Sequence, residues 1–449
     1  MKAVGNGSVS DVQRWWVLGL VSAMAVLQRA IWNDFGPIAD EVQKEFGWHN
    51  NLMLLLQYWG PIGYLLTANA WAWSLDYGSI RTSAHAAAAL VAAGSMLRCL
   101  WTQPGVWATV VINLGQFLNG LATPFMMTAG IVVSARWNFP TNERLLAMAV
   151  GVMSNYLGAS IAFILGPYVI RPDTAFSLSV QQYMFCEACV AVLLLIVCVF
   201  FFPDPPEPPA TDIDFPTAKK ALDESIGWNH CSAAFGNLYG FWGGWGYLLW
   251  PNFGHMFGDH SDFFGDHVVT WYQTPDLGGK LAFGGGCAGM VVGVALAAFL
   301  IRPSAEILKN ICLALQGPAI ILVVPLGYIA STMPHQHQVI LWACNILAGA
   351  CFTAIFPLHY WLAQQAVPQV GAGVSSVFLA RFHMKATLGF QALYLVCDNV
   401  PLPGLSAQWM NNPVLGTIAL AVFAVISAQN IFNYPCPILS YQGILQNQA

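Results

Sequence analysis

Charged side chains are scarce in this sequence. Asp, Glu, Lys and Arg together make up 8% of its 449 residues, whereas soluble globular proteins carry about 25%. A surface with so few charges cannot stay hydrated, which excludes an ordinary soluble domain. The net charge of −5 also leaves no basic surface of the kind that binds nucleic acid. Lipid is the solvent that suits a chain that is 57% hydrophobic.

The motifs of enzymes, ATP-driven pumps and metal sites are also missing. The sequence contains no HExxH, no GxSxG and no Walker motif, so we expect neither an enzyme nor direct use of ATP. The 11 Cys lie mostly inside apolar runs, and the spacing of Cys and His matches no zinc site. We interpret these Cys as small buried hydrophobes, and we expect no metal and no cofactor.

Long apolar runs are what the sequence has in abundance. A membrane helix needs roughly 20 mainly apolar residues in succession. The run that starts at Trp15 is too long for the core of a cleavable signal peptide. We therefore predict an all-α membrane protein with 12 transmembrane helices, and the runs lie at 15–38, 52–74, 82–101, 106–134, 143–170, 178–202, 227–250, 281–301, 307–329, 338–362, 372–397 and 412–433.

A Pro-rich, charged segment separates the first six runs from the last six. Residues 203–225 contain almost no large aliphatic side chains, which is typical of a linker. We predict an N-terminal six-helix half at 1–202, a cytoplasmic linker at 203–226, a C-terminal six-helix half at 227–436 and a cytoplasmic tail at 437–449. Two six-helix halves around a central polar loop are the layout of the major facilitator superfamily, and this is the fold that we predict.

The distribution of Lys and Arg predicts the topology, because cytoplasmic loops carry an excess of these residues. With the N-terminus in the cytoplasm, far more of the loop cations fall on the cytoplasmic side than on the other, so we expect both termini there. The cytoplasmic group is Lys2, Arg14, Arg81, Arg136, Arg144, Lys219, Lys220, Arg302 and Lys309, and the opposite group is Lys44, Arg171 and Lys280.

Short blocks of the first half point to a family. They are WNDFGPI at 32–38, WGPIG at 59–63, QFLNGLA at 116–122, ER at 143–144 and NYLG at 155–158. In order and spacing these blocks resemble the solute carrier 49 (SLC49) family of the major facilitator superfamily, which includes the feline leukaemia virus subgroup C receptor-related proteins. Within that family the likeness is greatest to the disrupted-in-renal-carcinoma protein 2 branch.

The resemblance implies a secondary transporter that moves a small organic solute by alternating access, either proton-linked or facilitative. Members of the family are associated with choline, ethanolamine, haem and, in this branch, lysosomal export of pyridoxine, so it implies a pyridoxine-like or choline-like substrate. It also implies a lysosomal, endosomal or plasma membrane. The expected partners are the solute, the lipid bilayer and protons. A non-transporting receptor or scaffold on a transporter fold is the alternative.

Aromatic and amide side chains predict the solute site. An aromatic ring can cover a cation or a planar heterocycle and an amide can orient it, which makes Trp32 and Asn33 candidates. An interfacial aromatic belt is the alternative for Trp32. The resemblance implies a cavity Trp in the first helix and aligns Trp245 with a cavity aromatic. It places Tyr156 where other branches have Gln. The choice between Trp242 and Trp245 for the cavity stays open.

Two acids in apolar runs are candidates for proton coupling. An ionised carboxylate inside a bilayer costs at least about 2.5 kcal/mol, so Glu187 is expected to be protonated or paired, and Asp34 is the second candidate. Both could serve as proton carriers. The alternative for Glu187 is a helix-end residue that touches the lumen, since Gln181 and Gln182 precede it closely.

Two further charged pairs stand out. Asp76 and Arg81 resemble the loop between the second and third helices of major facilitators, where an acid and a base form a latch that breaks during alternating access; an ordinary solvated loop is the alternative. Arg381 and Lys385 share one helix face at i, i+4. They predict either an anion site or a tilted helix from which both cations reach the membrane surface.

Overall fold

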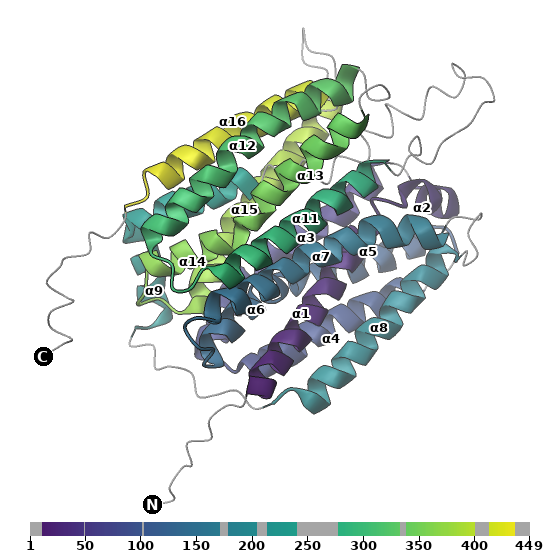
Figure 1. Cartoon of the computed structure of the whole chain (residues 1–449). Helices are drawn as coiled ribbons and strands as arrows, with labels where there is room; N and C mark the ends of the chain where they lie inside the picture. Colours follow the sequence, from purple (N-terminus) through teal and green to yellow (C-terminus); the bar gives the residue numbers. More distant parts are fainter. Residues whose placement is uncertain are drawn as a thin grey trace, which may run out of the picture.

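The computed structural model describes residues 11–48, 50–100, 103–170, 178–203, 213–239, 277–332, 338–399 and 413–435. Within these ranges the chain forms a bundle of long helices without a strand (Figure 1). The helices of the first half are α1 (Asp11–Asn33), α2 (Ala39–Phe46), α3 (Asn50–Tyr77), α4 (Ile80–Arg98), α5 (Val106–Leu121), α6 (Thr123–Arg136), α7 (Arg144–Ile170) and α8 (Val180–Phe201).

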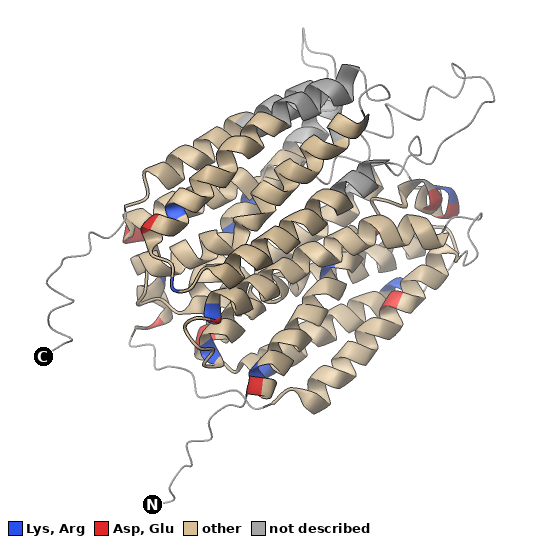
Figure 2. Cartoon of the chain, viewed as in Figure 1, with Lys and Arg blue, Asp and Glu red and all other residues tan. Residues whose placement is uncertain are grey.

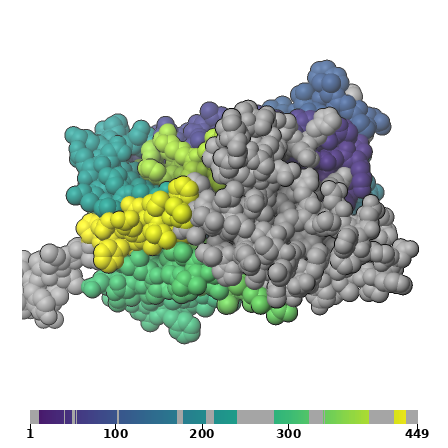
Figure 3. Space-filling model, turned by 90° about the horizontal axis from the view of Figure 1, so that it is seen from above, coloured from purple at the N-terminus to yellow at the C-terminus, as the bar shows by residue number. Residues whose placement is uncertain are grey.

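The second half repeats this plan after a short linker helix. Residues 226–239 are helical as well. The labelled helices are α9 (Phe215–Glu224), α11 (Leu277–Phe299), α12 (Ala305–Thr332), α13 (Gln338–Ala354), α14 (Phe356–Ala366), α15 (Ala372–Asn399) and α16 (Pro413–Phe432). In Figure 3, α16 (yellow) lies beside α12 (green), in agreement with their packing.

Each of the 12 predicted runs overlaps a helix among the described residues. Six helical stretches in this part of the chain are long and apolar enough to cross a membrane by length and composition. Helix starts follow the expected capping chemistry. Ser179 accepts a hydrogen bond from the backbone N–H of Gln182, whose side chain accepts one from the N–H of Ser179, and this reciprocal box opens α8.

Two predicted runs are each broken into two helices at a proline. Residues 106–134 divide between α5 and α6, with Pro124 in the first turn of α6. Residues 338–362 divide between α13 and α14, with Pro357 in the first turn of α14. Proline lacks the N–H that a continuous helix needs and is tolerated in a first turn. The two halves therefore share a broken fourth run, a structural likeness that sequence comparison of the halves does not reveal.

The two halves meet chiefly where α3 packs against α15 and α7 against α11, and α6 also packs against α15. Tyr64 on α3 donates to the carbonyl of Val377 on α15 (2.8 Å), and Tyr58 donates to the carbonyl of Gln391 (2.9 Å). Buried hydroxyls thus bond to the backbone of the opposite half, which satisfies polar groups that lipid could not.

The start of α1 and the ends of α8 and α16 lie at one end of the bundle together with α9, whereas α2 lies at the other (Figure 1). We call the first the linker end and the second the α2 end. Charged residues gather at both ends, and few lie between them (Figure 2). This is the charge pattern of a bundle whose middle lies in hydrocarbon.

Candidate functional site

A narrow pocket lies between the two halves, and both of them line it. As it stands, it has room for about one water molecule. Helices α1, α6 and α7 of the first half and α14 and α15 of the second contribute its walls. The lining residues are Arg29, Met127, Val152, Asn155, Tyr156, Phe356 and His383.

Arg29 brings a positive charge to this pocket. Its guanidinium carbon lies 4.1 Å from the ring centroid of Trp32, a cation–π contact. Trp32 itself is only 1% exposed, and its Nε1 donates to the carbonyl of Gln57 on α3 (2.9 Å). Asn33 donates to the carbonyl of Arg29 (2.7 Å). Trp32 and Asn33, expected in the solute site, are not among the residues that line this pocket, and each contacts Arg29 instead.

Tyr156 does line the pocket, as the sequence suggested. Its ring meets Phe356 edge to face, with centroids 5.1 Å apart, so one aromatic from each half closes the pocket. Asn155 donates to the carbonyl of Met126 (3.3 Å). Trp242 and Trp245 lie outside the described residues.

A cluster of rings in the second half supports Phe356. The ring of Tyr239 lies 4.3 Å from that of Phe356, and Phe235 lies 4.8 Å from it. Tyr239 donates to the carbonyl of Phe352 (3.2 Å), so its phenol has a partner although it is buried. His383 lies 6.4 Å from both Tyr239 and Phe356. These rings pack behind Phe356 on the side of the pocket that the second half forms.

The two acids predicted for proton coupling meet on one arginine. Arg98 on α4 is fully buried, and its Nη2 binds the carboxylates of Asp34 (3.2 Å) and Glu187. Its Nη1 donates to the amide oxygen of Gln116 (3.1 Å). Both carboxylates are buried, Asp34 at 1% exposure and Glu187 at 8%. The sequence singled out Asp34 and Glu187 separately, and the structure brings them together.

Asp76 joins the two halves at the linker end. Its carboxylate accepts from the backbone N–H groups of Gly373 (2.8 Å) and Val374 (2.6 Å), in the first turn of α15. The cation beside Asp76 is Arg136, which donates to the carbonyl of Leu75 (2.6 Å). The predicted latch acid is thus placed between the halves, and its partners are a helix N-terminus and Arg136 instead of Arg81.

Arg381 and Lys385 line no common pocket among the described parts of the chain. Lys385 is exposed, with Nζ 5.7 Å from the ring of Phe382. Arg381 is half-buried, with its guanidinium 5.6 Å from the ring of Phe378. The intervening residue, His383, faces the central pocket.

Arg29 and Arg98 are the charged site residues that sequence reasoning missed. Both lie within or at the end of apolar runs, where a cation is costly unless it lines a cavity or meets an acid. The cost of a cation in an apolar run could have identified both arginines as candidate site residues from the sequence. The sequence could not say which acid, 64 or 89 positions away, would reach Arg98.

A bundle of two halves with a pocket between them is the architecture of an alternating-access transporter. The family model of the Major Facilitator Superfamily matches residues 18–387, and the chain belongs to this superfamily. The solved structure of the proton:xylose symporter XylE shares the fold, with a TM-score of 0.66 and 12% identity over 94% of this chain and 96% of that one. The E. coli fucose:proton symporter FucP also shares it, with a TM-score of 0.63 and 12% identity over 93% of this chain and 99% of that one.

Curated relatives confirm the resemblance to the SLC49 family. The solute carrier family 49 member 4 homolog of Xenopus laevis is 26% identical over 442 residues, which cover 92% of this chain and 90% of the relative. The choline/ethanolamine transporter flvcr2a of Danio rerio is 28% identical over 222 residues, which cover 46% of this chain and 45% of the relative. The protein is a transporter of the major facilitator type.

Proposed function

We propose that this transporter carries a small organic solute with a planar ring, uncharged or anionic, and that the solute binds beside Arg29. The observation that supports this most is the lining of the central pocket, where a guanidinium from one half faces aromatic side chains from both. A solute held there contacts both halves at once. It can therefore be released to either side when the halves rock.

The charge of Arg29 argues against a permanently cationic solute. Two like charges 4 Å apart repel by about 4 kcal/mol in the partly polar interior of a protein. Among the candidates that the family suggests, a pyridoxine-like ring fits this pocket better than choline does. The relative named as a choline/ethanolamine transporter aligns with less than half of this chain.

Stacking and hydrogen bonding would hold such a ring. Tyr156 and Phe356 offer aromatic surfaces, and aromatic pairs contribute about 0.5–1.5 kcal/mol beyond the area that they bury. Arg29, Asn155 and His383 offer polar atoms for the ring substituents. Since the pocket holds about one water, the halves must separate at one end before a solute enters.

We further propose that Asp34, Arg98 and Glu187 couple transport to protons. One arginine balances one carboxylate, so two ionised carboxylates would leave a buried net negative charge, which is costly. A proton shared by Asp34 and Glu187 removes that cost. A second pocket, at the α2 end, reaches Arg98 between Cys99, Ser179 and Gln182, and it offers protons a route to this site.

The proposal keeps the predicted topology and boundaries. Both termini and the linker would face the cytoplasm, with two six-helix halves at 1–202 and 227–436. We place the protein in a lysosomal, endosomal or plasma membrane, and we assign it no enzymatic activity. A non-transporting receptor is the alternative, and uptake into vesicles separates the two.

A binding screen followed by uptake tests this function. Purified protein would be melted with pyridoxine, choline, ethanolamine, haem and small organic anions, because a ligand that binds the folded state raises the melting temperature. We expect stabilisation by a pyridoxine-like compound and its uptake into proteoliposomes. Stabilisation by choline alone, with choline uptake, would show the assignment of the solute to be wrong.

A further inference from the structure

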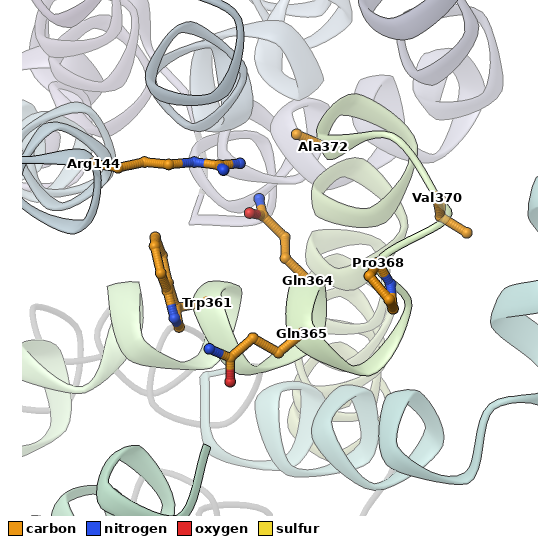
Figure 4. A pocket seen from close by; sticks show the side chains of 7 residues that line it. All are labelled: Arg144, Trp361, Gln364, Gln365, Pro368, Val370 and Ala372. Carbon is orange, nitrogen blue, oxygen red and sulfur yellow. The ribbon is translucent and has the colours of Figure 1, made fainter. Parts of the chain in front are cut away.

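A pocket at the linker end has no role in the function above. It has a volume of about 230 Å³ and is partly open to solvent, and it is lined by Arg144 of α7, three side chains of α14 and the segment that leads into α15 (Figure 4). It lies between the two halves, as the central pocket does, but no residue is shared between them. The lining residues are Arg144, Trp361, Gln364, Gln365, Pro368, Val370 and Ala372.

Several polar atoms around this pocket lack a partner. They are Nε of Arg144, Nε1 of Trp361, Nε2 of Gln364 and Oε1 of Gln365, each buried and without a hydrogen bond among the described residues. A buried polar group without a partner costs about 1–3 kcal/mol. Four such atoms around one pocket therefore indicate that the pocket has a bound partner for them. Three of the four are donors.

The charge of the pocket is positive. Arg144 extends over Trp361, with its guanidinium carbon 5.8 Å from the ring centroid, and the amide of Gln364 points toward the guanidinium (Figure 4). No carboxylate lines the pocket, and none forms an ion pair with Arg144 in the described part of the chain. The nearby acids have other partners: Asp76 binds the start of α15, and Glu143 lies 3.9 Å from Arg14.

We infer that this pocket binds a small soluble oxyanion, a carboxylate or a phosphate, as a second site at the linker end. Arg144 supplies the charge, and the N–H groups of Trp361 and Gln364 supply donors, the combination that recognises oxyanions. The indole ring offers a face to a flat carboxylate. The pocket between the halves favours a soluble anion over a lipid headgroup.

Occupancy of this site would bridge the halves. Arg144 belongs to the first half and Gln364 to the second, so an anion bound to both must leave before the linker end opens. A high concentration of the anion on the linker side is therefore expected to slow transport. This gives the site a regulatory role that is independent of which solute the central pocket takes.

Melting of the purified full chain in detergent tests the site, with inorganic phosphate and acetate as probes and chloride to hold ionic strength constant. At least one probe should stabilise the protein. Arg144→Gln and Trp361→Phe, which keeps the ring and removes the donor, should each raise the half-saturating concentration at least about tenfold. Lys220→Gln, which removes an exposed cation of α9, should leave it unchanged.

Two further variants make the result decisive. Gln364→Glu supplies an internal carboxylate beside Arg144, so it should abolish the response to both probes even if Arg144→Gln does not fold. Arg29→Gln should keep the response, which separates this site from the central pocket and from any failure of the proposed function. The inference is overturned if neither probe stabilises the protein, if Gln364→Glu responds normally, if Arg29→Gln loses the response, or if only anionic lipid in nanodiscs protects.

Discussion

Arg98 on α4 and Glu187 on α8 form an ion pair inside the bundle, and Asp34, the residue directly after α1, binds the same guanidinium nitrogen. Three helices of the first half are thus tied together by charges that lipid cannot solvate. The same arrangement leaves two carboxylates with one cation.

Replacing Glu187 by Gln should abolish pH-driven accumulation of solute and leave solute exchange intact. The amide keeps the shape of the carboxyl group but cannot carry the proton. Both activities would be measured in proteoliposomes with and without a pH gradient. Glu224→Gln, which changes an exposed acid of α9, is the control and should behave as wild type. Equal loss of exchange and accumulation would indicate a structural role for Glu187.

Removing Arg98 should destabilise the fold. Arg98→Gln leaves two buried carboxylates without their cation, and breaking a buried pair in this way costs about 3–5 kcal/mol. The triple variant with Asp34→Asn and Glu187→Gln carries no buried charge at this position. It should recover most of the lost melting temperature. A triple variant that melts as low as Arg98→Gln would show that the charges do not account for the loss.

Sequence reasoning found the acids of this cluster because a carboxylate inside an apolar run is conspicuous. It did not find Arg98, which lies near the end of the run at 82–101 and was given no partner. The contact depends on how α1, α4 and α8 cross, and no local pattern encodes that crossing. Trp32 shows the same limit: its run predicts the helix, but the packing of α1 against α3 turns its ring into the interior.

The resemblance to major facilitators predicted the latch acid, Asp76, but not the groups that it binds. Its position after the second run predicted a role for Asp76 in a latch, and the structure places Asp76 at the contact between the two halves. Its partners are backbone N–H groups of Gly373 and Val374, and backbone groups leave no mark in a sequence. The fold was more accessible, since long apolar runs and a Pro-rich linker already predict two bundles of helices.

Weakening the Asp76 latch should open the linker end. Asp76→Ala removes both acceptors at the start of α15 and the favourable charge at its N-terminus, which is worth about 0.3–1 kcal/mol by itself. Amide hydrogen exchange in a peptide spanning residues 371–376 should become faster, as measured by mass spectrometry. Asp223→Asn on the exposed face of α9 is the control. Unchanged exchange in Asp76→Ala would refute the latch.

The close approach of α6 and α7 gives a test of the packing itself. A methyl group at Gly151 would overlap the backbone of Gly130, and small residues of this kind let membrane helices touch. Gly151→Ala should therefore cost about 1–3 kcal/mol through overpacking and lower the melting temperature. Gly19→Ala, where nothing lies within 4 Å of the added methyl, is the control. Equal melting temperatures for Gly151→Ala and Gly19→Ala would contradict the close approach of α6 and α7.

The central pocket makes the most direct prediction about the solute. If Arg29 pairs with an acidic or hydroxyl group of the ring, Arg29→Gln should weaken apparent affinity at least about tenfold, because a hydrogen bond to a charged group contributes about 1.5–3 kcal/mol. Tyr156→Ala should weaken it by about 2- to 12-fold through loss of stacking worth about 0.5–1.5 kcal/mol. Tyr156→Phe keeps the ring and should retain most of the affinity.

Trp32 provides the matched comparison for this pocket, because its ring supports Arg29 without lining the site. Trp32→Phe keeps an aromatic face below the guanidinium and should change the apparent affinity less than Arg29→Gln does. Trp32→Ala removes that face and should weaken the apparent affinity almost as much as Arg29→Gln does. Concentration-dependent uptake into proteoliposomes would give the apparent affinities. If Arg29→Gln transports with wild-type affinity while Trp32→Ala loses affinity, the solute binds on the Trp32 side of α1, and the proposal that it binds beside Arg29 is wrong.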